Sequence, residues 1–95
     1  MTIGIAFAST YGDVSVGSSA TLIAPSNPLR KGLMIFNNSS QIIYIGMDNN
    51  VTTATGFPIL PTCTFATDDF DGVWKGAVWG ISTGSSDARY WEFGP

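Results

Sequence analysis

The chain has 95 residues and a formal net charge of −3, and 44% of its residues are hydrophobic while only 12% are charged. This length suits a single domain with one modest core. Four basic residues are too few for a phosphate-binding patch, so the composition argues against nucleic acid or an anionic membrane surface as a partner.

The counts of histidine and cysteine restrict the chemistry further. With no histidine, a Ser-His-Asp or Cys-His site and most zinc sites are excluded. The single cysteine, Cys63, cannot form an internal disulfide and is expected to pack as a small, buried or half-buried residue. No phosphate-cradling glycine motif is present. We therefore expect a non-enzymatic protein with no catalytic residue, cofactor or metal.

Short segments rich in β-branched and aromatic residues are separated by Gly or Pro at intervals of about eight to twelve residues, a pattern typical of all-β sandwiches and barrels. Residues 1–10 are expected to form an N-terminal arm or the first strand. The later predicted strands cover residues 13–16, 21–24, 33–36, 42–45, 57–60, 62–66, 77–82 and 89–93, and another strand is expected to begin at Val73-Trp74. The predicted fold is all-β: a small antiparallel β-sandwich or barrel, jelly-roll-like, with no substantial helix, in one domain spanning residues 1–95.

The N-terminal Ala6-Phe7-Ala8 resembles a signal-cleavage site, but no positive region precedes it and the apolar stretch is short. No window approaches the length of a membrane span. We therefore expect a non-secreted protein that is made in the cytoplasm without a signal peptide.

Two hairpins are predicted. One joins Leu33–Phe36 to Ile42–Ile45 through the polar turn 37–41, and the other joins residues 77–82 to 89–93. The two runs of the first hairpin show no polar alternation, and a strand that is apolar on both faces is usually buried on both. Either Met34, Phe36, Ile42 and Tyr44 lie on the outer face as scattered apolar residues, or a second copy or another chain covers them, which is the favoured alternative. The residues expected at contacts between copies are Phe36, Ile42, Tyr44 and Trp74.

The C-terminal third is rich in aromatic residues. Alternation places Tyr90 and Glu92 on one side of the last strand, and Trp91 and Phe93 on the other. Trp74, Trp79 and Trp91 are expected mainly in the core or an interface. Stacking of the three tryptophans on sugar rings is the alternative.

The densest acidic group is DDFDG, with Asp68, Asp69 and Asp71. Its spacing does not match a Ca²⁺ loop, so a structural turn is favoured over a divalent-ion site. The basic pair Arg30-Lys31 is expected either to pair with acids or blunt a strand edge, or to dock onto an acidic partner.

The run IAPSNPLRKGLMIFNNSSQIIYIGMDNNVTTATGFPIL, followed by GAVWGISTG and a final Arg-containing strand from Ala88 to Phe93, resembles small structural proteins of tailed bacteriophages. The resemblance covers roughly residues 23–93. It is a pattern of turn and strand residues that contains no reactive group. It implies a small antiparallel β-sandwich or barrel in a virion.

Capsid decoration (cement) proteins are the favoured family, with phage tail, fibre or carbohydrate-binding β modules as the alternative. A decoration protein is expected on the capsid surface of the virion, as a trimer or dimer that also binds the major capsid protein. The expected capsid contacts are Thr2, Ile3, Ile5 and Phe7 in the arm, together with Arg30 and Lys31.

Overall fold

The structure is a computed structural model that describes residues 8–68 and 72–94. These residues form eight β-strands and no helix. The strands are β1 (Ala8–Val16), β2 (Thr21–Ala24), β3 (Gly32–Asn37), β4 (Ile43–Gly46), β5 (Phe57–Ile59), β6 (Thr64–Asp68), β7 (Val78–Ser82) and β8 (Ser86–Gly94). The predicted all-β fold is confirmed.

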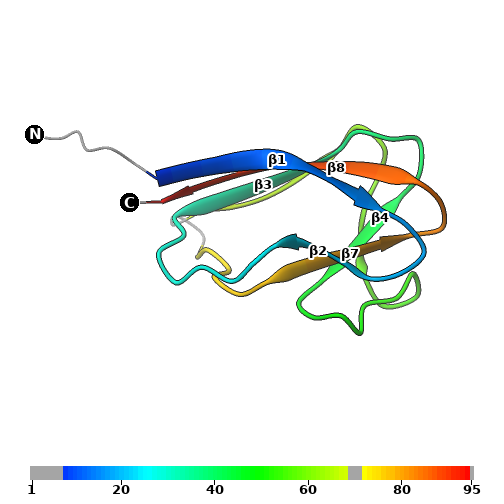
Figure 1. The fold of residues 1–95 in the computed structure, drawn as a ribbon, viewed down its shortest axis with the longest axis horizontal. Helices are drawn as coiled ribbons and strands as arrows, with labels where there is room; N and C mark the ends of the chain where they lie inside the picture. Colours follow the sequence, from blue (N-terminus) through cyan, green and yellow to red (C-terminus); the bar gives the residue numbers. More distant parts are fainter. Residues whose placement is uncertain (1–7, 69–71, 95) are drawn as a thin grey trace, which may run out of the picture.

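The strands form two four-stranded sheets that pack face to face (Figure 1). Sheet A has the order β1-β8-β3-β6, and sheet B has the order β2-β7-β4-β5. Every pairing is antiparallel. Two four-stranded sheets whose neighbours are mostly distant in sequence are typical of a jelly roll. The molecule is therefore an open sandwich rather than a closed barrel.

The core lies between the inner faces of the two sheets. Leu33 and Ile35 of β3 point inward from sheet A, and Ile43 and Ile45 of β4 point inward from sheet B. The cluster is completed by Val16, Ile23, Ala24, Ile59, Val78 and Ala88. Fully burying each large aliphatic side chain stabilises the fold by roughly 1.5–3 kcal/mol. Because side chains alternate along a strand, the other apolar residues of β3 and β4 lie on the outer faces of the two sheets.

Both predicted hairpins are wrong. β3 pairs with β6 and β8 in sheet A, whereas β4 pairs with β5 and β7 in sheet B. In the same way, β7 belongs to sheet B and β8 to sheet A. Each connection crosses from one sheet to the other instead of folding a strand back on its neighbour. A polar loop of a few residues can form either a hairpin within one sheet or a crossing between two sheets, so the local sequence does not distinguish the two connections.

The crossing from β3 to β4 is held by Asn37, which is fully buried. Its Nδ2 donates to the carbonyl oxygens of Gln41 at 2.6 Å and Ile59 at 2.8 Å. Its Oδ1 accepts from the backbone N–H and the hydroxyl of Ser39. One amide side chain thus satisfies backbone groups on both sides of the bend, as a buried polar group requires.

Some local expectations also change. The strand after Gly12 is part of the longer β1, and Val73-Trp74 lies in a loop, with β7 beginning at Val78. Cys63 is exposed instead of buried or half-buried. By contrast, β2 has the predicted bounds, and the predicted alternation in β8 is confirmed, with Tyr90 packed against the core and Trp91 exposed.

Candidate interaction surfaces

The outer face of sheet A carries a row of apolar side chains that crosses all four strands. The strand registers place Tyr11, Trp91, Met34 and Ala66 side by side. Tyr11 is 82% exposed and Trp91 52% exposed. Phe93 packs edge-on against Trp91, with ring centroids 6.3 Å apart. We call Tyr11, Met34, Phe36, Ala66, Trp91 and Phe93 the aromatic face.

This face is slightly hollowed. A depression of about 230 Å³ is lined by Met34, Phe36, Thr64, Arg89, Tyr90 and Trp91. Exposed aromatic rings beside a depression are typical of interaction sites, because rings bury a large area when a partner covers them.

Charged side chains border the aromatic face on one side. The register places Asp13 beside Arg89. Arg89 Nε donates to Asp87 Oδ2 at 2.9 Å, and Asn38 Nδ2 donates to the same carboxylate oxygen at 3.1 Å. These hydrogen bonds, from Arg89 first and Asn38 second, hold the pKa of Asp87 below its usual value of 3.8. The Asp87 carboxylate in turn raises the pKa of Arg89.

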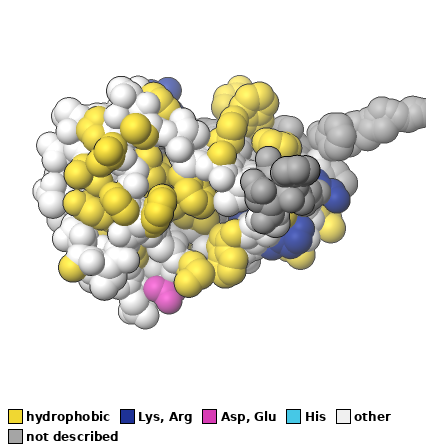
Figure 2. All heavy atoms as spheres, turned by 180° about the vertical axis from the view of Figure 1, so that it is seen from behind, with side chains coloured by type: hydrophobic (Ala, Val, Ile, Leu, Met, Phe, Trp, Pro, Cys, Tyr) yellow, Lys and Arg dark blue, Asp and Glu magenta, His cyan; other side chains and the backbone are white. Residues whose placement is uncertain are grey.

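A second surface is an apolar groove of about 270 Å³ where the two sheets open between β5 and β6. We call it the apolar groove. It is lined by Ile45, Gly46, Met47, Phe57, Phe65, Trp74 and Val78. Phe57 from sheet B meets Phe65 from sheet A edge-on, with centroids 5.9 Å apart. Seen from behind, the left half of the molecule shows many hydrophobic and few charged side chains (Figure 2).

Trp74 covers one end of the groove from the β6–β7 loop. Its indole Nε1 donates to the carbonyl oxygen of Ala77 at 3.0 Å. The ring lies so close to Gly76 that a Cβ there would meet ring atom Cζ2 at 2.3 Å. A glycine at position 76 is thus needed to seat this ring, which remains 42% exposed.

The outer face of sheet B is also apolar. Leu22 lies opposite Trp79, and Tyr44 lies between Ile81 and Pro58. Trp79, Tyr44 and Ile81 are half-buried. Leu22 and Pro58 are exposed on this face, but its rings, Tyr44 and Trp79, are less exposed than Tyr11 and Trp91 of the aromatic face.

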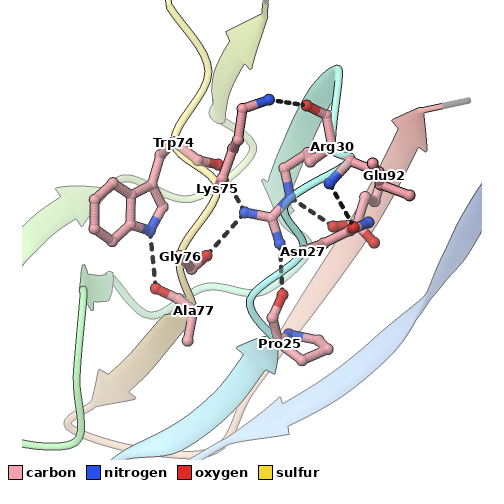
Figure 3. A network of polar contacts seen from close by, with 9 residues as sticks. Pro25, Asn27, Arg30, Trp74, Lys75, Gly76, Ala77 and Glu92 are labelled. Atoms are coloured by element: carbon pink, nitrogen blue, oxygen red, sulfur yellow. Dashed lines mark hydrogen bonds and ion pairs between the residues drawn. The ribbon is translucent and has the colours of Figure 1, made fainter.

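Arg30 lies in a network of polar contacts near one end of the sandwich (Figure 3). Its Nε donates to Glu92 Oε2 at 2.5 Å. Its Nη1 donates to the carbonyl oxygens of Trp74 at 2.7 Å and Gly76 at 2.9 Å, and its Nη2 donates to the carbonyl oxygen of Pro25 at 2.7 Å. One side chain therefore joins the β2–β3 loop, the β6–β7 loop and β8.

This geometry corrects the expected role of Arg30. The residue is fully buried, and its guanidinium hydrogen bonds go to groups of its own chain. Its side chain offers no surface to a capsid, so Arg30 is removed from the predicted capsid contacts. Of the two roles predicted for the Arg30-Lys31 pair, pairing with an acid is the one that the Glu92 contact supports.

The other predicted capsid contacts differ in what can be said of them. Thr2, Ile3, Ile5 and Phe7 lie outside the described residues. Lys31 is exposed, and its backbone N–H donates to the carbonyl oxygen of Phe93 at 2.8 Å. Since Gly94 pairs with Ala8, Lys31 lies at the end of sheet A where β1 begins. Lys31 and Ala8 thus lie at the same end of sheet A, on opposite sides of β8.

The four residues predicted at contacts between copies do not form one patch. Phe36 belongs to the aromatic face and Tyr44 to the outer face of sheet B, on the opposite side of the sandwich. Trp74 lines the apolar groove, and Ile42 is half-buried in the connection before β4. The three tryptophans are also dispersed, because Trp91, Trp79 and Trp74 lie on three different surfaces.

Several surface residues had no place in the sequence predictions. Tyr11 of the aromatic face is one of them, although its position between polar residues in STYGDVS is typical of an outward side chain. Met47, Phe57 and Phe65 of the groove come together only because β5 and β6 belong to different sheets. No sequence spacing indicates that meeting.

Within residues 8–68 and 72–94, no group of three or more His, Cys, Asp or Glu side chains is placed to hold a metal ion. The acidic positions Asp69 and Asp71 lie outside the described residues. The described part of the chain contains no helix long and apolar enough to cross a membrane.

Comparison with known proteins gave no matching family model, no similar curated protein and no similar solved structure. A function for this chain therefore has to be inferred from its fold and its surfaces.

Proposed function

We propose that this chain is a non-enzymatic structural protein of a tailed-phage virion, and specifically a capsid decoration protein that self-associates and binds the shell. The observation that carries the proposal is the aromatic face, with Tyr11 and Trp91 exposed on neighbouring strands of a four-stranded sheet. Apolar rings that span a sheet are covered most favourably by another protein surface.

The fold and composition support the same proposal. Jelly rolls are common among viral capsid domains, although a fold does not by itself imply a function. With only 12% charged residues, much of this surface is apolar or neutral. The resemblance to phage structural proteins supplies the source class. Lys31 and the arm residues remain the proposed contacts with the major capsid protein.

The mechanism is mass action. A protein that binds the assembled shell but not its free subunits stabilises the shell by its binding free energy. When many copies bind one shell, even a weak binding free energy per copy adds up to a large stabilisation of the shell. No chemical step is needed, and the structure must only hold its apolar side chains in a fixed arrangement.

Co-sedimentation with shells assembled from the major capsid protein of the same genome tests this function. We expect the wild-type protein to sediment with shells and Trp91→Lys to lose most of this binding, since the lysine charge would be desolvated at the contact. Thr53→Lys adds the same charge in an exposed loop and is expected to leave binding unchanged. A folded, concentrated monomer with no affinity for shells would refute the proposal.

A second candidate function, a carbohydrate-binding or fibre module, is favoured by one observation. Tyr11 and Trp91 lie opposite each other on neighbouring strands and are both exposed, which is the arrangement that ring stacking on a sugar requires. A glycan array distinguishes the two functions. Binding that Tyr11→Ala and Trp91→Ala both abolish, and that Trp79→Ala retains, would favour the module.

A further inference from the structure

The sandwich has four edge strands, and three of them carry features that discourage pairing with another chain. β5 is three residues long and has Pro58 at its centre. β2 is four residues long, and its register shifts between Leu22 and Ala24. β6 is five residues long and ends at the acidic residue Asp68, which another aspartate follows in the sequence. Short length, proline, irregularity and charge are the usual means of protecting an edge.

β1 is different. It is nine residues long, and its register with β8 runs without interruption from Ala8 to Val16. It contains no proline, no lysine and no arginine, and Asp13 is its only charged residue. β1 is also the last strand of sheet A, so one of its sides faces away from the sheet. A long, regular and unprotected edge is a template for another strand.

The hydrogen-bond pattern shows which groups point to this free side. Backbone N–H groups of Asn38 and Lys31 donate to the carbonyl oxygens of Asp87 and Phe93, so the odd-numbered residues of β8 face β3. The even-numbered residues of β8 then face β1, and the register pairs them with even-numbered residues of β1. The N–H and C=O groups directed away from the sheet are therefore those of Ser9, Tyr11, Asp13 and Ser15.

We propose that β1 pairs with β1 of a second copy, antiparallel about a two-fold axis at Gly12. Centring the pair on Gly12 overlaps all nine residues of both strands. It places Tyr11 of one copy opposite Asp13 of the other, where the phenol hydroxyl can donate to the carboxylate. Centring on Asp13 instead would oppose two like charges, which is unfavourable.

The result is a continuous eight-stranded sheet with closed two-fold symmetry. The two aromatic faces join into one surface, since residues paired across the axis point to the same side. This dimer does not depend on the virion role, because it follows from the strand edges alone. A shell-binding test and a dimer test can therefore fail separately.

Proline substitutions on two edges of the same sheet test the proposal. Ser15→Pro removes an N–H that points away from β8, so it leaves the ladder within the chain intact and blocks the intermolecular one. Ala66→Pro is the matched control on β6, because even-numbered residues of β6 also point away from the sheet. Circular dichroism and a thermal melt are the control that checks whether both variants are folded.

Sedimentation velocity at rising concentration gives the readout. We expect the wild-type and Ala66→Pro proteins to double in mass from 10.1 kDa. Ser15→Pro is expected to dimerise roughly tenfold to a hundredfold more weakly, because two main-chain hydrogen bonds are lost across the axis. Tyr11→Pro is a second variant of the same design, should Ser15→Pro be unfolded.

Cross-linking tests the register. In a Cys63→Ser background, Tyr11→Cys mixed with Asp13→Cys is expected to form a disulfide-linked pair, while Asp13→Cys alone forms far less. A wild-type monomer at all concentrations, a trimer, or a dimer that persists in both proline variants of β1 would overturn the proposal. A cross-link between two copies of Asp13→Cys as efficient as the mixed one would overturn the register.

Discussion

At the scale of single residues, the molecule depends on a few buried polar side chains. Arg30 and Glu92 form an ion pair whose side chains are 0% and 12% exposed. The remaining guanidinium hydrogen bonds go to three carbonyl oxygens of two loops. In the sequence, a charged residue in the polar segment PSNPLRKG, directly before Lys31, looks like a surface residue. Only the folded structure shows that two loops enclose Arg30 and that its buried side chain holds them to β8.

Replacing Glu92 by Gln is expected to lower the free energy of unfolding by about 3–5 kcal/mol, because Arg30 would remain buried without its counter-charge. Urea denaturation followed by tryptophan fluorescence measures the change. Asp87→Asn removes an acid that binds an exposed arginine, and we expect it to change stability little. Equal effects of the two substitutions would contradict an essential role for the Arg30 network.

Asp87 allows a prediction about pH. Because Arg89 and Asn38 donate to its carboxylate, the folded-state pKa lies below 3.8. The associated stabilisation is therefore present above pH 3.8 and is lost as the pH falls through the lower folded-state pKa. An NMR titration should show this low pKa in the wild type and a rise toward 3.8 in both variants, with the rise in Arg89→Gln larger than the rise in Asn38→Ala. An unchanged titration in Arg89→Gln would show that the Arg89 hydrogen bond is not what lowers the pKa.

At the scale of elements, strand faces were easier to predict than strand partners. Alternation in Tyr90–Phe93 correctly separated inward from outward side chains, and the bounds of β2 were correct. Both hairpins were wrong because β3 and β4, like β7 and β8, belong to different sheets. A turn of Asn and Ser residues is compatible with a hairpin and with a crossing, and packing of the two inner faces decides between them.

The crossing after β3 should be sensitive to Asn37. Asn37→Leu is expected to cost about 2–4 kcal/mol, since the carbonyl oxygens of Gln41 and Ile59 lose their donor in a buried site. Chemical denaturation measures this loss. Asn38→Leu is the neighbouring control, because Asn38 is exposed and contacts Asp87 only at the surface. A cost for Asn37→Leu no larger than that of the control would show that the bend is held by other contacts.

At the scale of the whole molecule, the fold is made of long-range pairings. β1 pairs with β8, β2 with β7 and β3 with β6, so the first strand finds its hydrogen-bonding partner only in the last strand of the chain. Such topologies close large loops before they gain contacts, and this closure slows folding.

We therefore expect refolding in milliseconds to seconds rather than microseconds. Stopped-flow fluorescence of the three tryptophans measures the rate. Val14→Ala in β1 and Val78→Ala in β7 should both destabilise the protein, because Val78 belongs to the core and Val14 packs against it. Refolding on the microsecond scale would contradict a transition state that must bring distant strands together.

The sequence by itself determined the class of the protein: an all-β domain with no histidine chemistry, few charges and short strands rich in β-branched and aromatic residues. Those properties follow from composition and from the two-residue period of a strand. The tertiary structure alone decided that Arg30 is internal, that Tyr11 and Trp91 share an open face, and that β1 is the long unprotected edge. Each of these depends on which distant strands are neighbours, and the free energy that selects neighbours comes from packing two sheets together.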